Sequence, residues 1–379
     1  MIDNIRPLNP NMEASTIKVT LMKGREAMHD MKVSWSTLLD QSSPRVVFAT
    51  YEWAESWLRV NLEVEPLIFV ATQGEEVVGF APLYVEKHRL AKFVPVRVLR
   101  VLGDTESAAE YLHPVIARKN AAEVINAIFK FLTKEFQWDL LWLPAQFAAD
   151  RTSFGLNSAL ESSQLGVLRR ASLFSNVALE KDIERLALRR SKSTRQMLRR
   201  TAKQYQDVKL TYHRVANSED VLPRFEQLQR LHGQRWQKVG QVGAFKRRPK
   251  LKSFLTTFLP ESYEQGWLNL CWLCVDGEPV AAQLGFEFDQ TYLLIQEGFD
   301  PGYEGTGNLL REWVMEQAVL GGLHHYDFLG GYSEHKRRWG AERVDGEDVL
   351  VTNRSLVGWL VRYFGLWPTG RFIQRDQAP

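Results

Sequence analysis

The sequence predicts an α/β protein with two tandem lobes, each a mixed β-sheet flanked by helices. Its 379 residues exceed the length of one typical domain. The turn at 73–77 (QGEEV) is repeated at 276–280 (DGEPV), each time inside a β-hairpin pattern. In both halves a helix and then a buried strand follow the hairpin. This shared order indicates two copies of one α/β unit.

The first lobe is expected over residues 19–180, after a flexible N-terminus at 1–18. A helix is predicted within 44–62, because Tyr51, Ala54, Trp57 and Leu58 fall on one face. The other expected elements are a hairpin at 66–87, a helix at 117–136 and a buried strand at 138–145 that ends at its proline.

The second lobe is expected over residues 181–352. A helix should run from Ser218, its N-cap, to Trp236. A hairpin at 270–286, a helix at 308–321 and a strand at 324–329 then follow the plan of the first lobe. The C-terminal part, 353–379, contains an aromatic amphipathic helix at 354–367. This helix is predicted to cover the sheet of the second lobe; the alternative is that it lies on a membrane surface.

The charge balance argues against a general affinity for DNA. The net charge is only +3, and charged residues make up 25% of the chain. One stretch, 189–203, carries seven basic residues and no acidic one. This stretch is either a solvated helix face or a local site for an anionic ligand or RNA.

The two cysteines do not indicate a metal site. Cys271 and Cys274 have C-x-x-C spacing, but they lie in an apolar strand-like run and the chain has no second pair. Two buried, reduced thiols are the better interpretation. Since the sequence shows neither a secretory signal nor an apolar run of about 18 residues, we expect a cytoplasmic protein.

A glycine-rich loop precedes the helix at 308–321. Backbone N–H groups at a helix N-terminus bind phosphate well. The candidate phosphate ligands are Gly302, Gly305, Thr306, Gly307 and Asn308.

With these elements in order, the chain resembles the GNAT acyltransferase superfamily. The resemblance rests on VDGEPVAAQLGFEF (275–288), the loop at 302–307, YDFLGGYSEHKRRWG (326–340), SKSTRQMLRR (191–200) and LHGQRW (231–236). It covers about residues 30 to 350. Within the superfamily the chain is similar to the double-GNAT branch of BioF2-like and CelD/BcsL acetyltransferases, and more distantly to the FemABX peptidyl transferases.

The resemblance implies acetyl-CoA or another acyl-CoA as co-substrate and no metal. Gly305 and Gly307 match the pyrophosphate loop of the family, whereas Gly302 stands where glutamine or arginine is usual. The matching segment of the first half, TESAAEYLHPVIARKN (105–120), has no glycine loop. We therefore expect only the second lobe to bind the acyl donor.

Several side chains are candidates for catalysis or acceptor binding. The general base is either His232, which shares a helical face with Arg235, or Glu287, which alternates with Gln283 on the second strand of the hairpin. The resemblance places Lys336, the third catalytic candidate, where this branch usually carries a lysine, and we expect it to pair with a phosphate or an acidic group of the acceptor. Trp236, Tyr332 and Trp53 complete the expected substrate-binding set. Asp327, inside an apolar strand, is predicted to be a paired structural acid.

The resemblance implies direct acyl transfer to a sugar amine or hydroxyl in bacterial exopolysaccharide or cellulose-type biosynthesis. Two alternatives stay open. One is a FemABX-like transferase that uses aminoacyl-tRNA in cell-wall synthesis. The other is a non-catalytic double-GNAT scaffold of a polysaccharide synthase. For the protein itself, a peripheral position at the inner membrane is the alternative to a purely cytoplasmic location.

Overall fold

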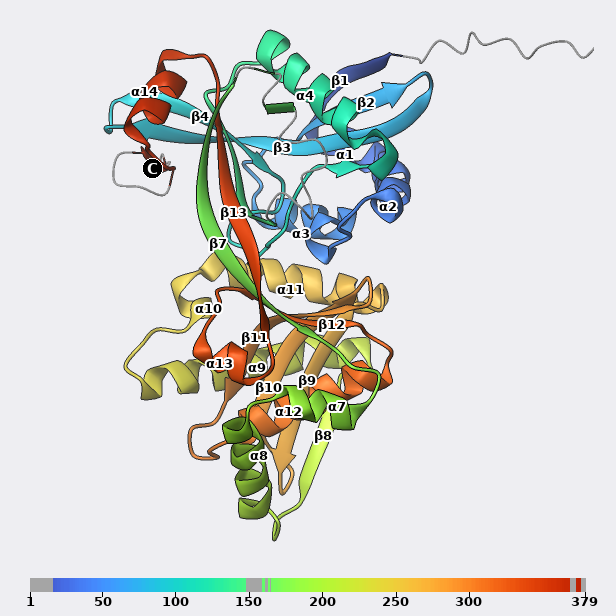
Figure 1. Cartoon of the computed structure of the whole chain (residues 1–379), viewed down its shortest axis with the longest axis vertical. Helices are drawn as coiled ribbons and strands as arrows, with labels where there is room; N and C mark the ends of the chain where they lie inside the picture. Colours follow the sequence, from blue (N-terminus) through green and yellow to red (C-terminus); the bar gives the residue numbers. More distant parts are fainter. Residues whose placement is uncertain (1–15, 148–158, 161–162, 164, 369–372, 376–379) are drawn as a thin grey trace, which may run out of the picture.

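A computed structural model describes residues 16–147, 159–160, 163, 165–368 and 373–375. The expected flexible N-terminus lies almost entirely outside these residues. Two lobes are stacked along the long axis, and two long strands, β7 (Gly166–Ala178) and β13 (Glu342–Thr352), pass from one lobe to the other (Figure 1). The expected α/β class and tandem lobes are therefore confirmed.

The described strands form one continuous sheet instead of two separate ones. Its order is β1-β2-β3-β4-β6-β13-β7-β12-β11-β10-β9-β8. β13 pairs antiparallel with β7 along its whole length and also with β6. Because β7 and β13 each run through both lobes, residues 166–178 and 342–352 contribute to both of them.

The first lobe places helices on a strongly curved sheet. Its strands are β1 (Ile17–Lys23), β2 (Leu67–Gln73), β3 (Glu76–Leu90), β4 (Val94–Val101), β5 (Val115–Ile116), β6 (Leu140–Phe147) and β14 (Ile373–Arg375). Its helices are α1 (Gly24–Asp30), α2 (Lys32–Gln41), α3 (Tyr51–Val60) and α4 (Ala121–Glu135), with 3-10 turns at Val47–Ala49 and Arg118–Asn120.

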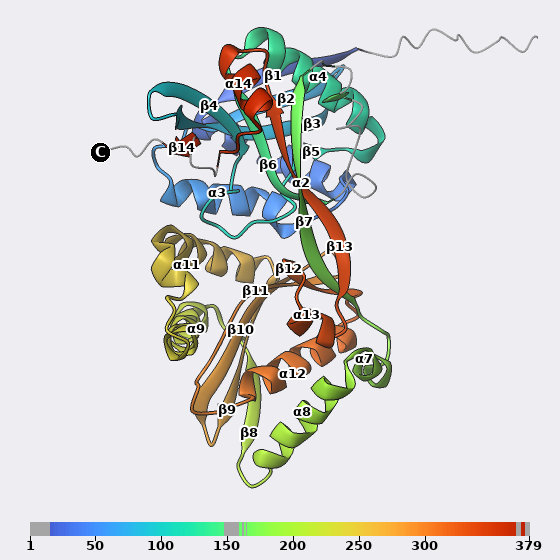
Figure 2. The ribbon, with the colours of Figure 1, turned by 60° about the vertical axis from the view of Figure 1, so that its left-hand side comes forward.

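The second lobe repeats the plan. Its strands are β8 (Leu210–Arg214), β9 (Leu268–Val275), β10 (Glu278–Phe288), β11 (Thr291–Phe299) and β12 (His325–Gly330). Its helices are α7 (Ile183–Arg189), α8 (Lys192–Gln204), α9 (Ser218–Lys238), α10 (Ala244–Arg247), α11 (Pro249–Glu264), α12 (Thr306–Leu320) and α13 (Glu334–Arg338). In Figure 2, α9 and α11 cover one face of the sheet and α12 and α8 cover the other.

The lobes share an aromatic contact between α3 and α11. Trp53 is fully buried there, with its ring 4.6 Å from Phe254 and 4.8 Å from Phe258. Its indole N–H donates to the carbonyl of Gly103 at 3.1 Å. Trp53 is thus part of the core between the lobes. The prediction that it binds the substrate was wrong.

Most predicted elements lie within a few residues of their observed bounds. The helix expected from Ser218 has Asn217 as its N-cap, so Ser218 is the first helical residue. The strand predicted to end at its proline instead continues through Pro144 to Phe147. Cys271 and Cys274 are buried on β9 as free thiols, and burial raises the pKa of Cys271 to about 12.

The C-terminal helix, α14 (Leu356–Phe364), packs on the first lobe instead of the second. Its Val361, together with the partly buried Val357 and Leu360, joins a cluster that contains Val98 and Leu140. The expectation that it covers the second sheet was wrong, because β13 carries the chain back to the first lobe before α14 begins. None of the helices in the described part of the chain has the length and apolar content to cross a bilayer.

Candidate active site

The parallel strands β11 and β12 separate soon after they pair. They are joined only from Thr291 opposite His325 to Leu293 opposite Asp327. β11 then carries a bulge at Ile295, because Leu284 and Gly285 of β10 lie opposite Gln296 and Leu294. A bulge leaves its extra residue unpaired and bends the strand. The result is a wedge-shaped opening in the sheet.

A cavity of about 250 Å³ lies at this opening. Its lining comes from β11, β12, α9, α12 and α13: His232, Arg235, Trp236, Leu294, Ile295, Gln296, Glu297, Arg311, Phe328, His335 and Lys336. The structure thus brings together His232, Arg235, Trp236 and Lys336 from the predicted set. Glu297, Arg311 and His335 were not predicted.

Glu297, which is partly buried, and the buried Arg311 form an ion pair in the wall of the cavity. Both carboxylate oxygens of Glu297 accept hydrogen bonds from Arg311, and one also accepts from Arg235 at 3.0 Å. Burial alone would raise the pKa of Glu297, but the two guanidinium groups outweigh it and hold the pKa at about 2. Glu297 is therefore an ionised structural acid and not a proton acceptor.

The lining has an excess of positive charge. Arg235, Arg311 and Lys336 face a single carboxylate in the cavity. The ring Nε2 of His335 lies 3.2 Å from a guanidinium nitrogen of Arg311. Because arginine only donates, this nitrogen accepts and the ring is neutral; burial and then Arg311 lower the pKa of His335. The cavity suits a ligand that is anionic or that develops negative charge.

Two buried donors at the cavity have no acceptor within the described part of the chain. They are the indole N–H of Trp236 and the Nε–H of Arg311. Buried polar groups in native proteins are almost always hydrogen bonded. Both atoms are shielded from solvent, so a ligand oxygen in the cavity would accept from them only after the side chains turn toward it.

Lys336 holds the end of β12. Its ammonium group contacts the carbonyls of Phe328 at 3.0 Å, Leu329 at 3.2 Å, Gly330 and Gly331. Burial lowers the pKa of Lys336, and the nearby carboxyls of Glu110 and Asp327 oppose this change. The lysine thus lies between β12 and two acids, one of which belongs to the first lobe.

Glu110 is an acid that the sequence analysis missed. It is partly buried in the segment after β4 and lies against Gly330, at the end of β12. Its Oε2 is shielded from solvent and has no hydrogen-bond partner. Burial and then the charge of Asp327 raise the pKa of Glu110 to about 8, although Lys336 lowers it. An acid of this kind exchanges a proton near neutral pH.

Asp327 is a paired acid, as predicted. It accepts from the hydroxyl of Tyr111 at 3.1 Å and from the N–H of Leu329 at 2.7 Å. Burial raises its pKa to about 6. Since Tyr111 follows Glu110, one segment of the first lobe contributes both contacts to the second.

His232 cannot act as the general base in this arrangement. Its Nδ1–H donates to the carbonyl of Glu297 at 2.9 Å, and its Nε2 accepts from the N–H of Ala244 at 3.0 Å. Both ring nitrogens are used, and burial lowers the pKa. His232 ties the loop after α9 to strand β11.

The other expected acceptor residues lie outside the cavity. Glu287 pairs with Arg214 and accepts from Asn269 near the start of β9. Gln283 donates to the hydroxyls of Tyr292 and Tyr326, deep in the core beneath α12. Tyr332 lies between β12 and α13 but does not line the cavity.

Packing explains the glycines before α12. A Cβ on Gly305, whose φ is +85°, would lie 2.7 Å from Thr201 of α8, and one on Gly307 would lie 2.9 Å from Phe299. The N–H of Gly302 already donates to Asp300, and those of Thr306 and Asn308 bond within the turn. The N–H of Gly307 has no backbone acceptor among the described residues, and Lys238 reaches the same turn at the carbonyl of Pro301.

The basic stretch 189–203 is only partly available to ligands. Arg189 pairs with Glu180 and Glu342, and the buried Arg190 pairs with Glu312. Arg195 donates to the carbonyls of Leu188 and Arg190. The remaining cations are exposed on α8: Lys192, Arg199, Arg200 and Lys203.

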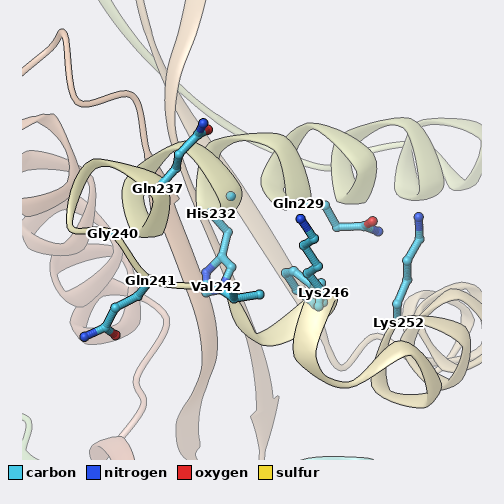
Figure 3. Close-up of a pocket in the computed structure, with 11 residues that line it drawn as sticks. Gln229, His232, Gln237, Gly240, Gln241, Val242, Lys246 and Lys252 are labelled. Atoms are coloured by element: carbon cyan, nitrogen blue, oxygen red, sulfur yellow. The ribbon is translucent and has the colours of Figure 1, made fainter.

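A groove of about 620 Å³ adjoins the cavity on the other side of His232. It lies between α9, the following loop and the start of α11, and Lys246 and Lys252 rise toward α9 on either side of Gln229 (Figure 3). Its lining contains three glutamines and two lysines and no acid: Gln229, His232, Gly233, Gln237, Gly240, Gln241, Val242, Gly243, Phe245, Lys246 and Lys252. The amide of Gln229 has a buried nitrogen without a partner.

Sequence comparison identifies the part of the chain that forms this site. Residues 192–337 match the model of the acetyltransferase (GNAT) domain family. This segment is a GNAT domain. It contains the glycine loop, the separated strands and every residue of the cavity lining. Glu110 lies outside the GNAT domain and reaches it from the first lobe.

Solved structures share the two-lobed fold around the GNAT domain. A crystal structure of FemX has a TM-score of 0.63 at 12% identity, covering 88% of this chain and 98% of that chain. The C-terminal DUF2156 domain of a putative lysylphosphatidylglycerol synthetase from Agrobacterium fabrum has a TM-score of 0.52 at 11% identity, covering 89% and 96%. At these identities the likeness concerns the fold alone. No curated protein matches the chain in sequence.

Proposed function

We propose that the protein transfers an acyl group, with acetyl the first to test, from acyl-CoA to an amine or hydroxyl of a sugar. The acceptor would belong to bacterial exopolysaccharide biosynthesis. The observation that carries the proposal is the cavity between β11 and β12 of the GNAT domain, with its unsatisfied N–H donors. A thioester carbonyl has the acceptor oxygen that these donors lack.

The residues present fit a phosphate-bearing donor. The N–H of Gly307, which has no backbone acceptor among the described residues, and the ammonium of Lys238 would hold its phosphates at the start of a 15-residue helix. The thioester would then lie beside Trp236 and Arg311. Their N–H groups would stabilise the negative charge that develops on the carbonyl oxygen.

The acceptor is proposed to lie in the groove beside His232. Amide side chains bond hydroxyl groups well, and Lys246 and Lys252 favour an acceptor that carries a negative charge. An anionic sugar, such as one with a phosphate or carboxylate, meets both conditions. The loop that forms the groove is fixed to β11 through His232, so the acceptor would be held at a set distance from the cavity.

Glu110 is the proposed general base. The acceptor attacks the carbonyl carbon, the carbon–sulfur bond breaks, and Glu110 takes the proton of the attacking amine or hydroxyl. Glu110 is not in the lining of the cavity or the groove, but it lies against Gly330 at the end of β12 and beside Lys336, which does line the cavity, and this contact supports the role. His335 is not chosen, because its Nε2 is bonded to Arg311.

A FemABX-like transfer from aminoacyl-tRNA is the second candidate. It is supported by the fold shared with FemX over nearly the whole of both chains and by the exposed cations of α8. Phosphates of RNA would contact these cations, and binding would weaken steeply with salt.

Thermal unfolding with acetyl-CoA, CoA and adenosine bisphosphate distinguishes an acyl-CoA donor from an aminoacyl-tRNA donor. A ligand at 100 times its Kd stabilises the folded state by about 2.7 kcal/mol, so acetyl-CoA should raise Tm. Lys238→Glu should reduce the shift, while Lys192→Glu, on α8, should not. Absence of a shift at millimolar ligand, with salt-sensitive binding of tRNA, would favour the second candidate. Absence of both would favour a non-catalytic scaffold.

Substitutions in the groove should weaken acceptor binding without affecting the donor. Lys246→Glu and Lys252→Glu place negative charge where an anionic acceptor is proposed to lie. We expect KM for an anionic sugar to rise about tenfold or more in each, as for loss of one charged hydrogen bond, with kcat little changed. Lys250→Glu is the matched control, because Lys250 pairs with Glu63 of the first lobe. An unchanged KM in both groove variants would remove the groove from the proposal.

A further inference from the structure

Helix α14 presents an apolar face to solvent as well as to the protein. Val357, Leu360 and Val361 pack on the first lobe. On the other side Leu356 is 74% exposed, Trp359 56%, Tyr363 70% and Phe364 62%. The rings of Trp359 and Tyr363 stack with their centroids 5.2 Å apart, so the two side chains form one continuous aromatic surface. A helix that is apolar all round is normally buried or in a membrane.

A second element adds to this face. The turn between β3 and β4 carries Phe93, which is 82% exposed, and Val94. Leu90, which precedes this turn, belongs to the same cluster as Val357 and Leu360 of α14. α14 and the β3–β4 turn therefore lie beside one another, as Figure 1 shows. We call these six side chains the apolar face: Leu356, Trp359, Tyr363, Phe364, Phe93 and Val94.

The charged residues within the two segments that carry the apolar face are all basic, although Asp139 of a neighbouring segment pairs with Arg97. Residues 87–103 and 349–368 contain no aspartate or glutamate. Lys92 adjoins Phe93, and Arg362 adjoins Tyr363, and both cations are exposed. Each cation near an anionic bilayer adds about 1 kcal/mol of attraction. Tryptophan and tyrosine beside arginine are also the residues preferred at a membrane–water interface.

From this combination we infer that the apolar face docks the protein on an anionic lipid surface. Nine residues are too few to span a bilayer, so α14 lies in the interface with its aromatic side chains in the headgroup region. The face belongs to the first lobe, away from the cavity and the groove (Figure 1). The inference therefore does not depend on the proposed function.

Vesicle flotation of the full chain tests this inference. Vesicles of phosphatidylcholine with phosphatidylglycerol should carry the protein upward, and vesicles of phosphatidylcholine alone should carry much less. The triple variant Trp359→Ser/Tyr363→Ser/Phe364→Ser should lose at least about tenfold in bound fraction, because three exposed aromatic contacts are removed. These side chains are exposed, so the fold should be retained, and far-UV circular dichroism checks it.

The matched control is Val33→Ser/Leu62→Ser/Leu188→Ser, which removes three apolar residues elsewhere that are at least as exposed. It should float like the unmodified protein. Equal loss in both triple variants, no flotation of the unmodified protein, or equal binding to both vesicle types would each overturn the inference. A dimer in light scattering that only the aromatic variant abolishes, without flotation, would show that a second copy covers the face instead.

Discussion

Glu110→Gln is expected to abolish most of the acyl transfer while leaving the protein folded. The substituted amide keeps the shape of the side chain but cannot accept a proton. Loss of a general base lowers kcat by about 10²- to 10⁴-fold. The measurement is kcat and KM at saturating donor, and Glu106→Gln in the same segment is the matched control. Loss confined to KM, or a loss below about threefold, would contradict the role of Glu110.

The same substitution should have a recognisable pH signature. Burial raises the pKa of Glu110 to about 8, so the unmodified enzyme should gain activity as pH rises through that value. The residual activity of Glu110→Gln should lack this step.

Glu110→Gln should lower activity but raise the stability of the folded protein at high pH. The folded protein holds the proton of Glu110 more tightly than the unfolded chain does, so ionisation of this group costs stability between about pH 4.5 and pH 8. Glu110→Gln removes that cost, and its Tm should exceed that of the unmodified protein above about pH 8. A variant that is more stable and less active marks a functional position.

Glu297→Gln is expected to destabilise the protein strongly. It leaves Arg311 and Arg235 without their carboxylate, and removal of one partner from a buried pair costs about 3–5 kcal/mol. Urea unfolding near neutral pH measures this difference. The pKa of Glu297 is lowered to about 2, so its contribution is present above the ordinary value of 4.5 and is lost as pH falls through about 2. The gap between variant and unmodified protein should close over that interval.

Two further variants test whether the loss of stability comes from an unpaired buried charge. Glu287→Gln removes a more exposed pair with Arg214 and should cost less than about 1 kcal/mol. It should also retain activity, although the sequence suggested Glu287 as a base. Glu297→Gln/Arg311→Met removes both charges and should recover much of the lost stability. A double variant no more stable than the single one would show that the loss came from packing and not from an unpaired charge.

Local patterns in the sequence were enough to predict the two lobes. Hairpin turns and helical stripes depend on neighbouring residues, and these lie close to their observed bounds. The predicted position of α14 was wrong, because the position depends on β13 crossing between the lobes and local sequence patterns do not encode this crossing. The same crossing merges the two expected sheets into one.

The site was predicted in part. Arg235, Trp236 and Lys336 line the cavity, but the role given to His232 was wrong, because its partners Ala244 and the carbonyl of Glu297 come from other segments. Arg311 could have been noticed as a cation within the buried stripe of its helix, between Leu310 and Val314. Residues 230–260 contain eight basic residues and no acidic one, and this pattern could have indicated the groove. Glu110 had no such signal, since its meaning depends on a contact between lobes.

Calorimetric titration of acetyl-CoA into the unmodified protein and into Gln296→Trp tests whether the acyl donor binds in the cavity between β11 and β12. Gln296 is half-buried in the lining of the cavity between β11 and β12, so a tryptophan there should fill the space proposed for the thioester. Gln204→Trp, exposed on α8, is the control. We expect acetyl-CoA to bind the unmodified protein and the control alike, and to bind Gln296→Trp at least about tenfold more weakly, equal to about 1.4 kcal/mol. Equal affinity in all three proteins would show that acetyl-CoA does not bind in this cavity.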